Sequence, residues 1–569
     1  MMFAFLTPGV RGGADPMASA KSAAAWLADL PSLDIVARQQ LVLRAFDAIR
    51  QSPRTFDAAR VQALLHVDAA LGGDRRKLFK QYVETLDSTP KVAERVWQAS
   101  FDLAQAFIGA YQAAIETALV PSSYARGKPQ VPVLFARLIH YYGTDAKLRV
   151  SRHEHWIPAK WVELHGAYLR ATELGLERVP TQPGSAAAAG TQWTIEQEYV
   201  YVLLVHQLNT GNLTAGNLDW VLTQFRAWSR RLEIVAMPKS MEGFFVDVAG
   251  REGLVRRTGQ DSGAMLRYLD TTPLCDQLDM TLAALRHSEA TDQGPVSAVN
   301  QQRAMILEKA RPAIAPNLNL DLRRDPRISC IHAARVRIGL ARILKELSTQ
   351  DVAGTAEVHA EETRSGEQIE VYAVAGAARS QSRGASENDT LSVSLAQFPE
   401  SLWQVKDRSV AGLRICASGG VGQTLMLGAL AAVRESVRRQ WALGVVRRVN
   451  KLSSDEVEAG LSVIAERIVA VGLYTQRGSR DNLGIEVNGV DALSLGPRFD
   501  GLYLPPPSRP DKPLTVKTVI IPTQEYTEGR KLMLVTEHSI YTVALRQLVE
   551  QRADWSWVAI QVVEKKARN

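Results

Sequence analysis

Residues 402–415 read LWQVKDRSVAGLRI, and this stretch decides how the second half of the chain is interpreted. Within it, Asp407, Ser409 and Gly412 form the pattern D-x-S-x-x-G between two strand-like runs. Three fixed positions match by accident in about one chain in ten of this length. The pattern alone is therefore not diagnostic and is interpreted together with the sequence around it.

Further strand-like runs surround this stretch. One half-buried strand is predicted by the alternating residues Ile328, Cys330, His332, Ala334, Val336 and Ile338. Closely spaced strands separated by turn residues predict one or two small β-barrels. The other predicted strands are Leu402–Lys406, Leu413–Ala417, Leu425–Val433, Trp441–Val449, Gly460–Ala465, Val516–Ile521, Lys531–Val535 and Ile540–Leu545.

The first half of the chain has helical periodicity. From about residue 23 to residue 232, apolar side chains recur on one helical face, as at Trp97 and Phe101. Thr194 and Gln197 form a capping-box pair ahead of an apolar run, which predicts the start of a helix. This half is therefore expected to consist of packed helical hairpins.

These patterns predict an α+β multidomain protein, in which a helical N-terminal region precedes an antiparallel β-barrel and a small C-terminal β-rich module. Past the helical hairpins we expect a short strand at Phe244–Val248 and a helix over Leu266–Leu285. The expected segments are a tail at 1–22, a helical-hairpin domain at 23–235, a helical and mixed connector at 236–318, a barrel domain with an inserted loop at 319–480, and the C-terminal module at 481–569.

The composition is that of a globular protein. The chain has 569 residues, 46% hydrophobic and 22% charged, and this length suits several domains. No apolar run approaches the roughly 20 residues of a membrane helix, so no membrane insertion is expected. The apolar start at Met1–Leu6 is too short for a signal peptide, and Met17 is an alternative start.

Charge and cysteine usage narrow the expected partners and location. The formal net charge of +7 favours anionic partners but is spread over a long chain, which argues against nucleic acid as a partner. The three cysteines are far apart and form no C-x-x-C pair, which argues against a disulfide framework or a cysteine zinc site. A reducing cytoplasm fits this usage best.

The order of motifs resembles that of the PilZ domain. That family places an R-x-x-x-R pair near the first barrel strand, then [DN]-x-S-x-x-G, then a strand ending in arginine, then a glycine opening a further strand. Here Asp407, Ser409 and Gly412 match the second motif, and WALGVVRRVNK and Gly460 follow. The whole chain resembles large bacterial PilZ-like proteins with a helical N-terminal region, in stretches such as EYVYVLLVHQL and LTVKTVIIPTQEY.

This resemblance implies a cytoplasmic, non-catalytic receptor or effector of cyclic di-GMP, tied to surface behaviour such as type IV pili or motility. It implies no cofactor besides that ligand, and the helical region would bind a protein partner. Arginine forks can pair with a phosphate or with guanine O6 and N7. Asp407 would accept from guanine or orient an arginine, and Ser409 would bind a phosphate or the backbone. Gly412 would allow close approach or take a dihedral that other residues avoid.

Two arginine pairs compete for the first motif. Arg379 and Arg383 have the family's usual distance to Asp407 but lie in a loop-like segment. Arg323 and Arg327 directly precede a strand but require a long insertion before Asp407. We favour Arg323 and Arg327, because an arginine anchored at a strand start is better preorganised.

Other interpretations remain open or carry less weight. A barrel that has lost its ligand would make the chain a protein–protein adaptor or scaffold. The stretch 418–424 resembles a phosphate loop, but Ala417 replaces its first glycine and Gln423 its lysine. His153, His155 and the more distant His165 lack the spacing of a metal site. We therefore predict neither a metal nor catalytic residues.

Overall fold

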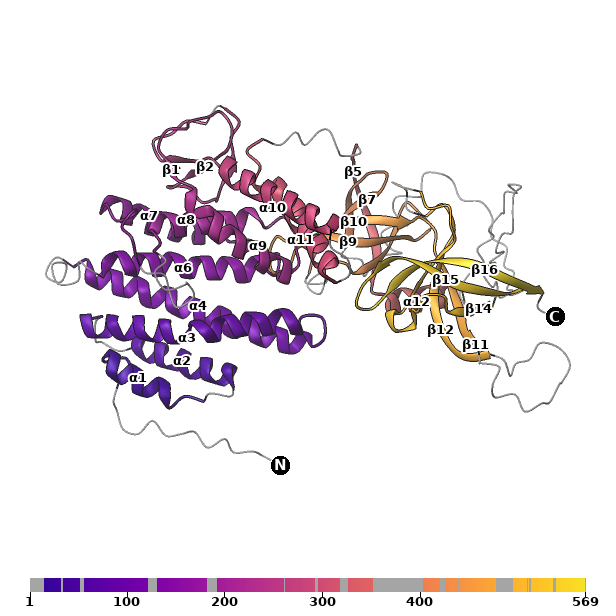
Figure 1. Cartoon of the computed structure of the whole chain (residues 1–569), viewed down its shortest axis with the longest axis horizontal. Helices are drawn as coiled ribbons and strands as arrows, with labels where there is room; N and C mark the ends of the chain where they lie inside the picture. The colour runs from indigo at the N-terminus through magenta and orange to yellow at the C-terminus, as the bar shows by residue number, and fades with distance from the viewer. Residues whose placement is uncertain are drawn as a thin grey trace, which may run out of the picture. The chain divides into compact units, whose positions relative to one another are not determined.

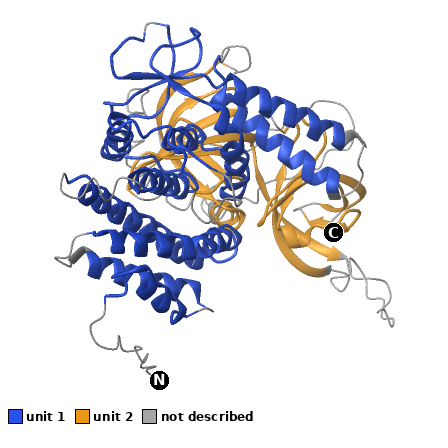
Figure 2. Cartoon of the chain, turned by 60° about the vertical axis from the view of Figure 1, so that its left-hand side comes forward, with its two compact units in different colours: residues 1–319 blue, residues 320–569 orange. Residues whose placement is uncertain are grey.

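The computed structural model divides into two compact units, residues 1–319 and 320–569, which Figure 2 colours separately. Among the described residues, no helix combines the length and the apolar composition needed to cross a bilayer. The structure describes residues 15–567 except 32–33, 52–55, 121–129, 182–191, 260, 292–294, 318–325, 352–402, 420–424, 439, 477–494, 509, 511–512 and 536–538.

Helices dominate the first unit, as the sequence predicts. Figure 1 shows α1 to α9 stacked in successive layers with roughly parallel axes. The predicted capping box is confirmed: Thr194 Oγ1 accepts from the backbone N–H of Gln197 at 3.2 Å, and the Gln197 side chain accepts from Thr194 N at 3.1 Å. The helices are α1 (Ala20–Ala28), α2 (Ile35–Gln51), α3 (Ala58–Thr85), α4 (Pro90–Ala118), α6 (Val131–Val150), α7 (Pro158–Glu173), α8 (Ile195–Gln207) and α9 (Ala215–Trp228), with the 3₁₀ turn η1 (Ser229–Arg231) after α9.

Asp68 on α3 is the centre of a buried polar network in this unit. Its carboxylate is fully buried and accepts hydrogen bonds from the hydroxyls of Tyr111 (2.6 Å) and Tyr141 (2.7 Å). Arg75 and Arg137 pair with the same carboxylate at 2.9 and 3.5 Å. Burial raises the pKa of Asp68, but these charges and hydroxyls outweigh it and hold the pKa below its usual value. The charged carboxylate therefore ties α3 to α4 and α6.

A small antiparallel sheet and a helical hairpin complete the first unit. The prediction of a helix over Leu266–Leu285 was wrong at its start, because Leu266–Leu269 forms a strand in which Leu269 lies opposite Phe244. The helix begins only at Thr272, whose N–H donates to the Asp270 side chain. The sheet has the order β1-β4-β2-β3, with β1 (Ile234–Val235), β2 (Phe244–Asp247), β3 (Val255–Arg256) and β4 (Leu266–Leu269), and the hairpin is α10 (Thr272–Thr291) and α11 (Pro295–Ile314).

Six described strands of the second unit close into an antiparallel barrel, in the order β10-β7-β6-β5-β8-β9. The predicted strand Ile328–Ile338 is confirmed as β5. The strand predicted from Leu425 begins only at Leu430, because Gly428 has a φ of 83° and its N–H donates to the carbonyl of Val446. The other strands are β6 (Trp403–Arg408), β7 (Gly412–Ala417), β8 (Leu430–Glu435), β9 (Ala442–Lys451) and β10 (Val457–Ala465).

A second closed barrel follows, in the order β11-β12-β13-β16-β15-β14. Its first strand, β11, pairs with β12 and β14. The expected boundary at residue 480 therefore moves to the turn between Ala465 and Val469. The strands are β11 (Val469–Gln476), β12 (Leu495–Leu504), β13 (Thr518–Ile521), β14 (Lys531–Val535), β15 (Ser539–Gln551) and β16 (Ser556–Ala567).

The two barrels share an apolar core in addition to their own interiors. Helix α12 (Leu340–Asp351), which follows β5, contributes Leu340 and Ile343 to it. Leu430 of β8 and Trp555 of the second barrel also belong to this shared core, and both are fully buried. Strand β8 is therefore apolar on both faces, since its alternate residues fill the interior of the first barrel.

We predict that Ile343→Ala destabilises the second unit (residues 320–569, here called the β unit) by about 2–5 kcal/mol. Ile343 is 1% exposed, and its removal leaves a cavity beside both barrels. Urea unfolding followed by tryptophan fluorescence measures the change. Arg342→Ala, on the exposed side of the same helix, is the matched control and should change stability by less than about 0.5 kcal/mol. Equal effects of the two substitutions would contradict the shared core.

Candidate functional site

Strand pairing brings the two sequence motifs to one end of the first barrel. In the β5–β6 ladder, Ser329 lies opposite Asp407, so Arg327, just before β5, lies beside the end of β6. The β6–β7 hairpin places Asp407 opposite Arg414. Its turn is closed by the N–H of Ser409, which donates to the carbonyl of Gly412 at 2.8 Å. Three strands therefore converge on the D-x-S-x-x-G turn.

The carboxylate of Asp407 joins two arginines in this cluster. Its Oδ1 lies 2.5 Å from Arg327 Nη1, and its Oδ2 lies 2.6 Å from Arg414 Nε. The second contact is an ion pair that is not aligned as a hydrogen bond. The Asp407 side chain is 11% exposed, whereas Arg327 and Arg414 are 45% and 42% exposed. The acid is thus covered, and both guanidinium groups keep N–H donors facing solvent.

Gly412 leaves space for two neighbouring side chains and does not take an unusual backbone conformation. A Cβ at this position would lie 3.0 Å from Ser409 Oγ and 3.5 Å from Arg327 Nη2. Of the two alternatives given for this glycine, the special dihedral is excluded, since its φ is not among the positive values in the structure. The missing side chain lets the serine hydroxyl and the arginine fork lie against the strand.

A second ion cluster lies next to the first, around the buried carboxylate of Glu435. Arg408 donates to Glu435 at 2.6 Å and to Glu466 at 3.1 Å. His332 Nδ1 lies 3.2 Å from the same Glu435. Because Glu435 is only 4% exposed, these partners balance its charge inside the barrel wall. Arg408 is therefore engaged within the protein, although it lies between the residues of the motif.

The structure brings together four of the predicted site residues: Arg327, Asp407, Ser409 and Gly412. The remaining predicted residues, Arg323 and the alternative pair Arg379 and Arg383, lie outside the described residues.

Sequence reasoning missed Arg414, which shares Asp407 with Arg327. A signal for it was present, since a hairpin whose turn spans 409–412 places residue 407 opposite residue 414.

The histidines considered for a metal have other surroundings. His165 is buried and contacts the hydroxyl of Tyr199 at 2.7 Å and the carbonyl of Glu252 at 2.9 Å. Burial lowers its pKa, as for a neutral core imidazole. Within the described part of the chain, no three histidine, cysteine or acidic side chains are grouped to hold a metal ion. The glycine-rich stretch 418–424 lies mostly outside that part.

We predict that Gly412→Ala changes the stability of the β unit by less than about 1 kcal/mol, because the Ser409 hydroxyl can rotate away from the new methyl group. Gly444→Ala is the matched substitution, since its Cβ would lie 3.0 Å from the backbone carbonyl of Ser462, which cannot move freely. It should cost about 1–3 kcal/mol in urea unfolding. A larger cost for Gly412→Ala would show that this glycine serves folding and not the surface of the site.

Family models match one segment in each of the two units. The family described as "Cyclic-di-GMP receptor FimW, N-terminal domain" matches residues 21–239, and "Cyclic-di-GMP receptor FimW, middle PilZ domain" matches residues 341–468. The second match ends at the turn between the barrels, and Arg327 and β5 lie before its start. No curated protein and no solved structure shows significant similarity to the chain. The two matched domains, in the same order and over more than half of its length, show that this chain belongs to the FimW family of cyclic-di-GMP receptors.

Proposed function

We propose that this chain is a non-catalytic receptor that binds cyclic di-GMP at the end of its first barrel. The site comprises Arg327, Asp407, Ser409 and Gly412, together with Arg323, which precedes Arg327 by one R-x-x-x-R spacing. The observation that supports this site best is the Asp407 carboxylate, which holds two half-exposed arginines at the turn. Membership of a receptor family for this nucleotide supports the choice of ligand.

The arrangement suits a ligand with two phosphates and two guanines. A guanidinium carries five N–H donors, so Arg327 can keep one on Asp407 and present others to a phosphate or to guanine O6 and N7. Ser409 adds a hydroxyl at the same surface. Arg414, held by the same carboxylate and 3.5 Å from Glu458, adds a guanidinium group that the motif alone does not include.

Asp407 is a positioning residue for these arginines before the ligand arrives. The ion pairs with Asp407 restrict both guanidinium groups, which lowers the conformational entropy lost on binding. Once a phosphate takes over part of their charge, the carboxylate can accept from guanine N–H groups.

We predict that the purified full chain binds cyclic di-GMP in calorimetry and that Arg327→Ala weakens binding by about tenfold or more, since it removes a charge-assisted hydrogen bond. Asp407→Ala should weaken it as well, because both arginines lose the group that orients them. The matched control is Arg342→Ala, an exposed arginine on α12, beyond the opposite end of β5.

An absence of heat at high ligand concentration would count against the receptor. If the same protein then formed a stable complex in pull-downs, the chain would be a ligand-free adaptor. Equal weakening by Arg327→Ala and Arg342→Ala would instead place the nucleotide elsewhere on the protein.

We further propose that the receptor acts in the cytoplasm on surface behaviour such as type IV pili or motility. It would do so through a protein partner bound to the first unit (residues 1–319, here called the helical unit). Ligand binding would change the affinity for that partner by differential contacts in two states.

Chromosomal Arg327→Ala should then reproduce the surface-motility phenotype of a deletion in the bacterium that encodes the chain, with Arg342→Ala behaving as wild type. A deletion without a surface phenotype would contradict this role, even if the nucleotide binds.

A further inference from the structure

The helical unit contains a groove of about 860 Å³ that is separate from the barrel site. Residues of α3, from Gly72 to Glu84, line one wall, and residues of α4, α6, α8 and α9 with η1, together with Trp193, line the rest. The close approach of α9 to α3 closes one side, since a Cβ at Gly216 would lie 3.2 Å from Val83. All residues that line the groove belong to the first unit, so the barrel site contributes nothing to it.

Positive charge dominates the walls of this groove, where six cationic side chains face two carboxylates, Glu84 and Asp219. Asp219 pairs with a lysine across the groove wall, and Glu84 lies 3.7 Å from another on the same helix. The cationic residues are Arg75, Arg76, Lys80, Lys147, Arg226 and Arg230.

The inner cations are fixed by the protein itself. Arg226 lies between the rings of Trp193 and Tyr201, 4.4 and 4.6 Å from their centroids, and forms an ion pair with Glu198. Burial acts to raise the pKa of Glu198, but Arg226 and His140 lower it to about 2. This pair therefore stays charged and holds the floor of the groove in place.

The outer cations have no acidic partner of this kind. Within the described parts of the chain, no carboxylate lies within ion-pair distance of Arg76 or Arg230, and both side chains are exposed. Arg230 lies 5.2 Å from the Trp193 ring and donates to the carbonyl of Gln192. These two guanidinium groups come from α3 and η1, on different walls of the groove. Each can therefore contact an anionic occupant from its own side.

The shape favours an extended occupant. The lining residues of α3 span Gly72 to Glu84, which corresponds to roughly 18 Å of helix, the length of about six residues of extended peptide. Two arginines already lie over the Trp193 ring, so that ring is not free to stack on a nucleobase. The apolar residues Phe79 and Leu222 also line the groove but are buried, so an occupant would meet mainly charged side chains.

We propose that this groove binds an acidic segment of a partner protein, with Arg76 and Arg230 as its contacts on opposite walls. Charge complementarity would guide the encounter and the aligned walls would fix the direction of the segment.

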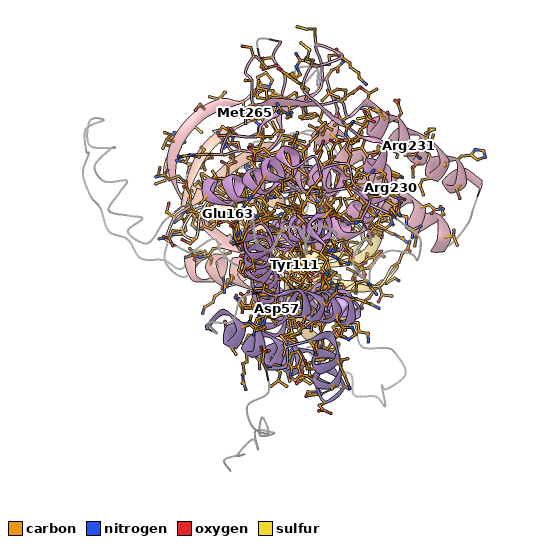
Figure 3. All side chains as sticks on the ribbon, turned by 90° about the vertical axis from the view of Figure 1, so that its left-hand side faces the viewer. Asp57, Tyr111, Glu163, Arg230, Arg231 and Met265 are labelled. Carbon is orange, nitrogen blue, oxygen red and sulfur yellow. The ribbon has the colours of Figure 1, made fainter. Side chains whose placement is uncertain are left out.

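The test uses fluorescein-labelled hexaglutamate and the full chain in fluorescence anisotropy at low ionic strength. The double variant Arg76→Glu/Arg230→Glu should weaken binding by about tenfold or more. The control, Lys77→Glu/Arg231→Glu, makes the same change in net charge at exposed neighbours that do not line the groove. Figure 3 labels Arg230 and Arg231, which are adjacent in η1. The control should bind within about threefold of wild type.

Three results would overturn the proposal. If the wild-type protein does not bind hexaglutamate, the groove does not recognise an acidic segment. Equal weakening in both double variants would reduce it to attraction by net charge. Calorimetric binding of pyrophosphate that is lost in Arg76→Glu/Arg230→Glu, without binding of hexaglutamate, would assign the groove to a small phosphorylated ligand. Cyclic di-GMP titrations of the same variants should be unchanged, which separates this inference from the barrel site.

Discussion

The antiparallel pairing of β5 with β6 is the interaction on which the candidate site depends. Its register sets Ile328 opposite Arg408 and Ser329 opposite Asp407, so residues about eighty positions apart in sequence become neighbours. A shift by one residue would turn Asp407 to the other face of the sheet and separate it from Arg327. Barrel closure protects this register, because every described strand of the barrel has two neighbours and none is a free edge.

Local patterns in the sequence predicted much of the fold. Alternation identified β5, capping residues identified the start of α8, and the D-x-S-x-x-G turn identified the hairpin of the site. Leu266–Leu269 was misread, because the four residues Leu-Arg-Tyr-Leu next to a helix are too few to show a period of their own. Strand β16 was missed altogether, and its pairing with β13 and β15 closes the second barrel. The pairing of β16 with β13, which places Ile520 opposite Trp557, cannot be read from local periodicity.

The site was predictable only where local sequence patterns reveal it. Residue types and spacing indicated Asp407, Ser409 and Gly412, and the start of a strand favoured Arg327. What the sequence could not supply was the sharing of one carboxylate between two arginines, which depends on three strands meeting. The groove of the helical unit was equally hidden, since its cations come from α3, α6, α9 and η1 and resemble scattered surface charge when read in order.

The core that the two barrels share has a thermodynamic consequence. Side chains such as Leu430 and Trp555 are buried only while both barrels are folded, so the barrels should lose structure together. A ligand that stabilises the first barrel should then stabilise the second barrel as well. A ligand bound to the first at one hundred times its dissociation constant would stabilise the pair by about 2.7 kcal/mol, and amide exchange in β12 and β16 would slow accordingly. Ligand binding at the end of the first barrel would therefore be measurable in strands that are not part of the site.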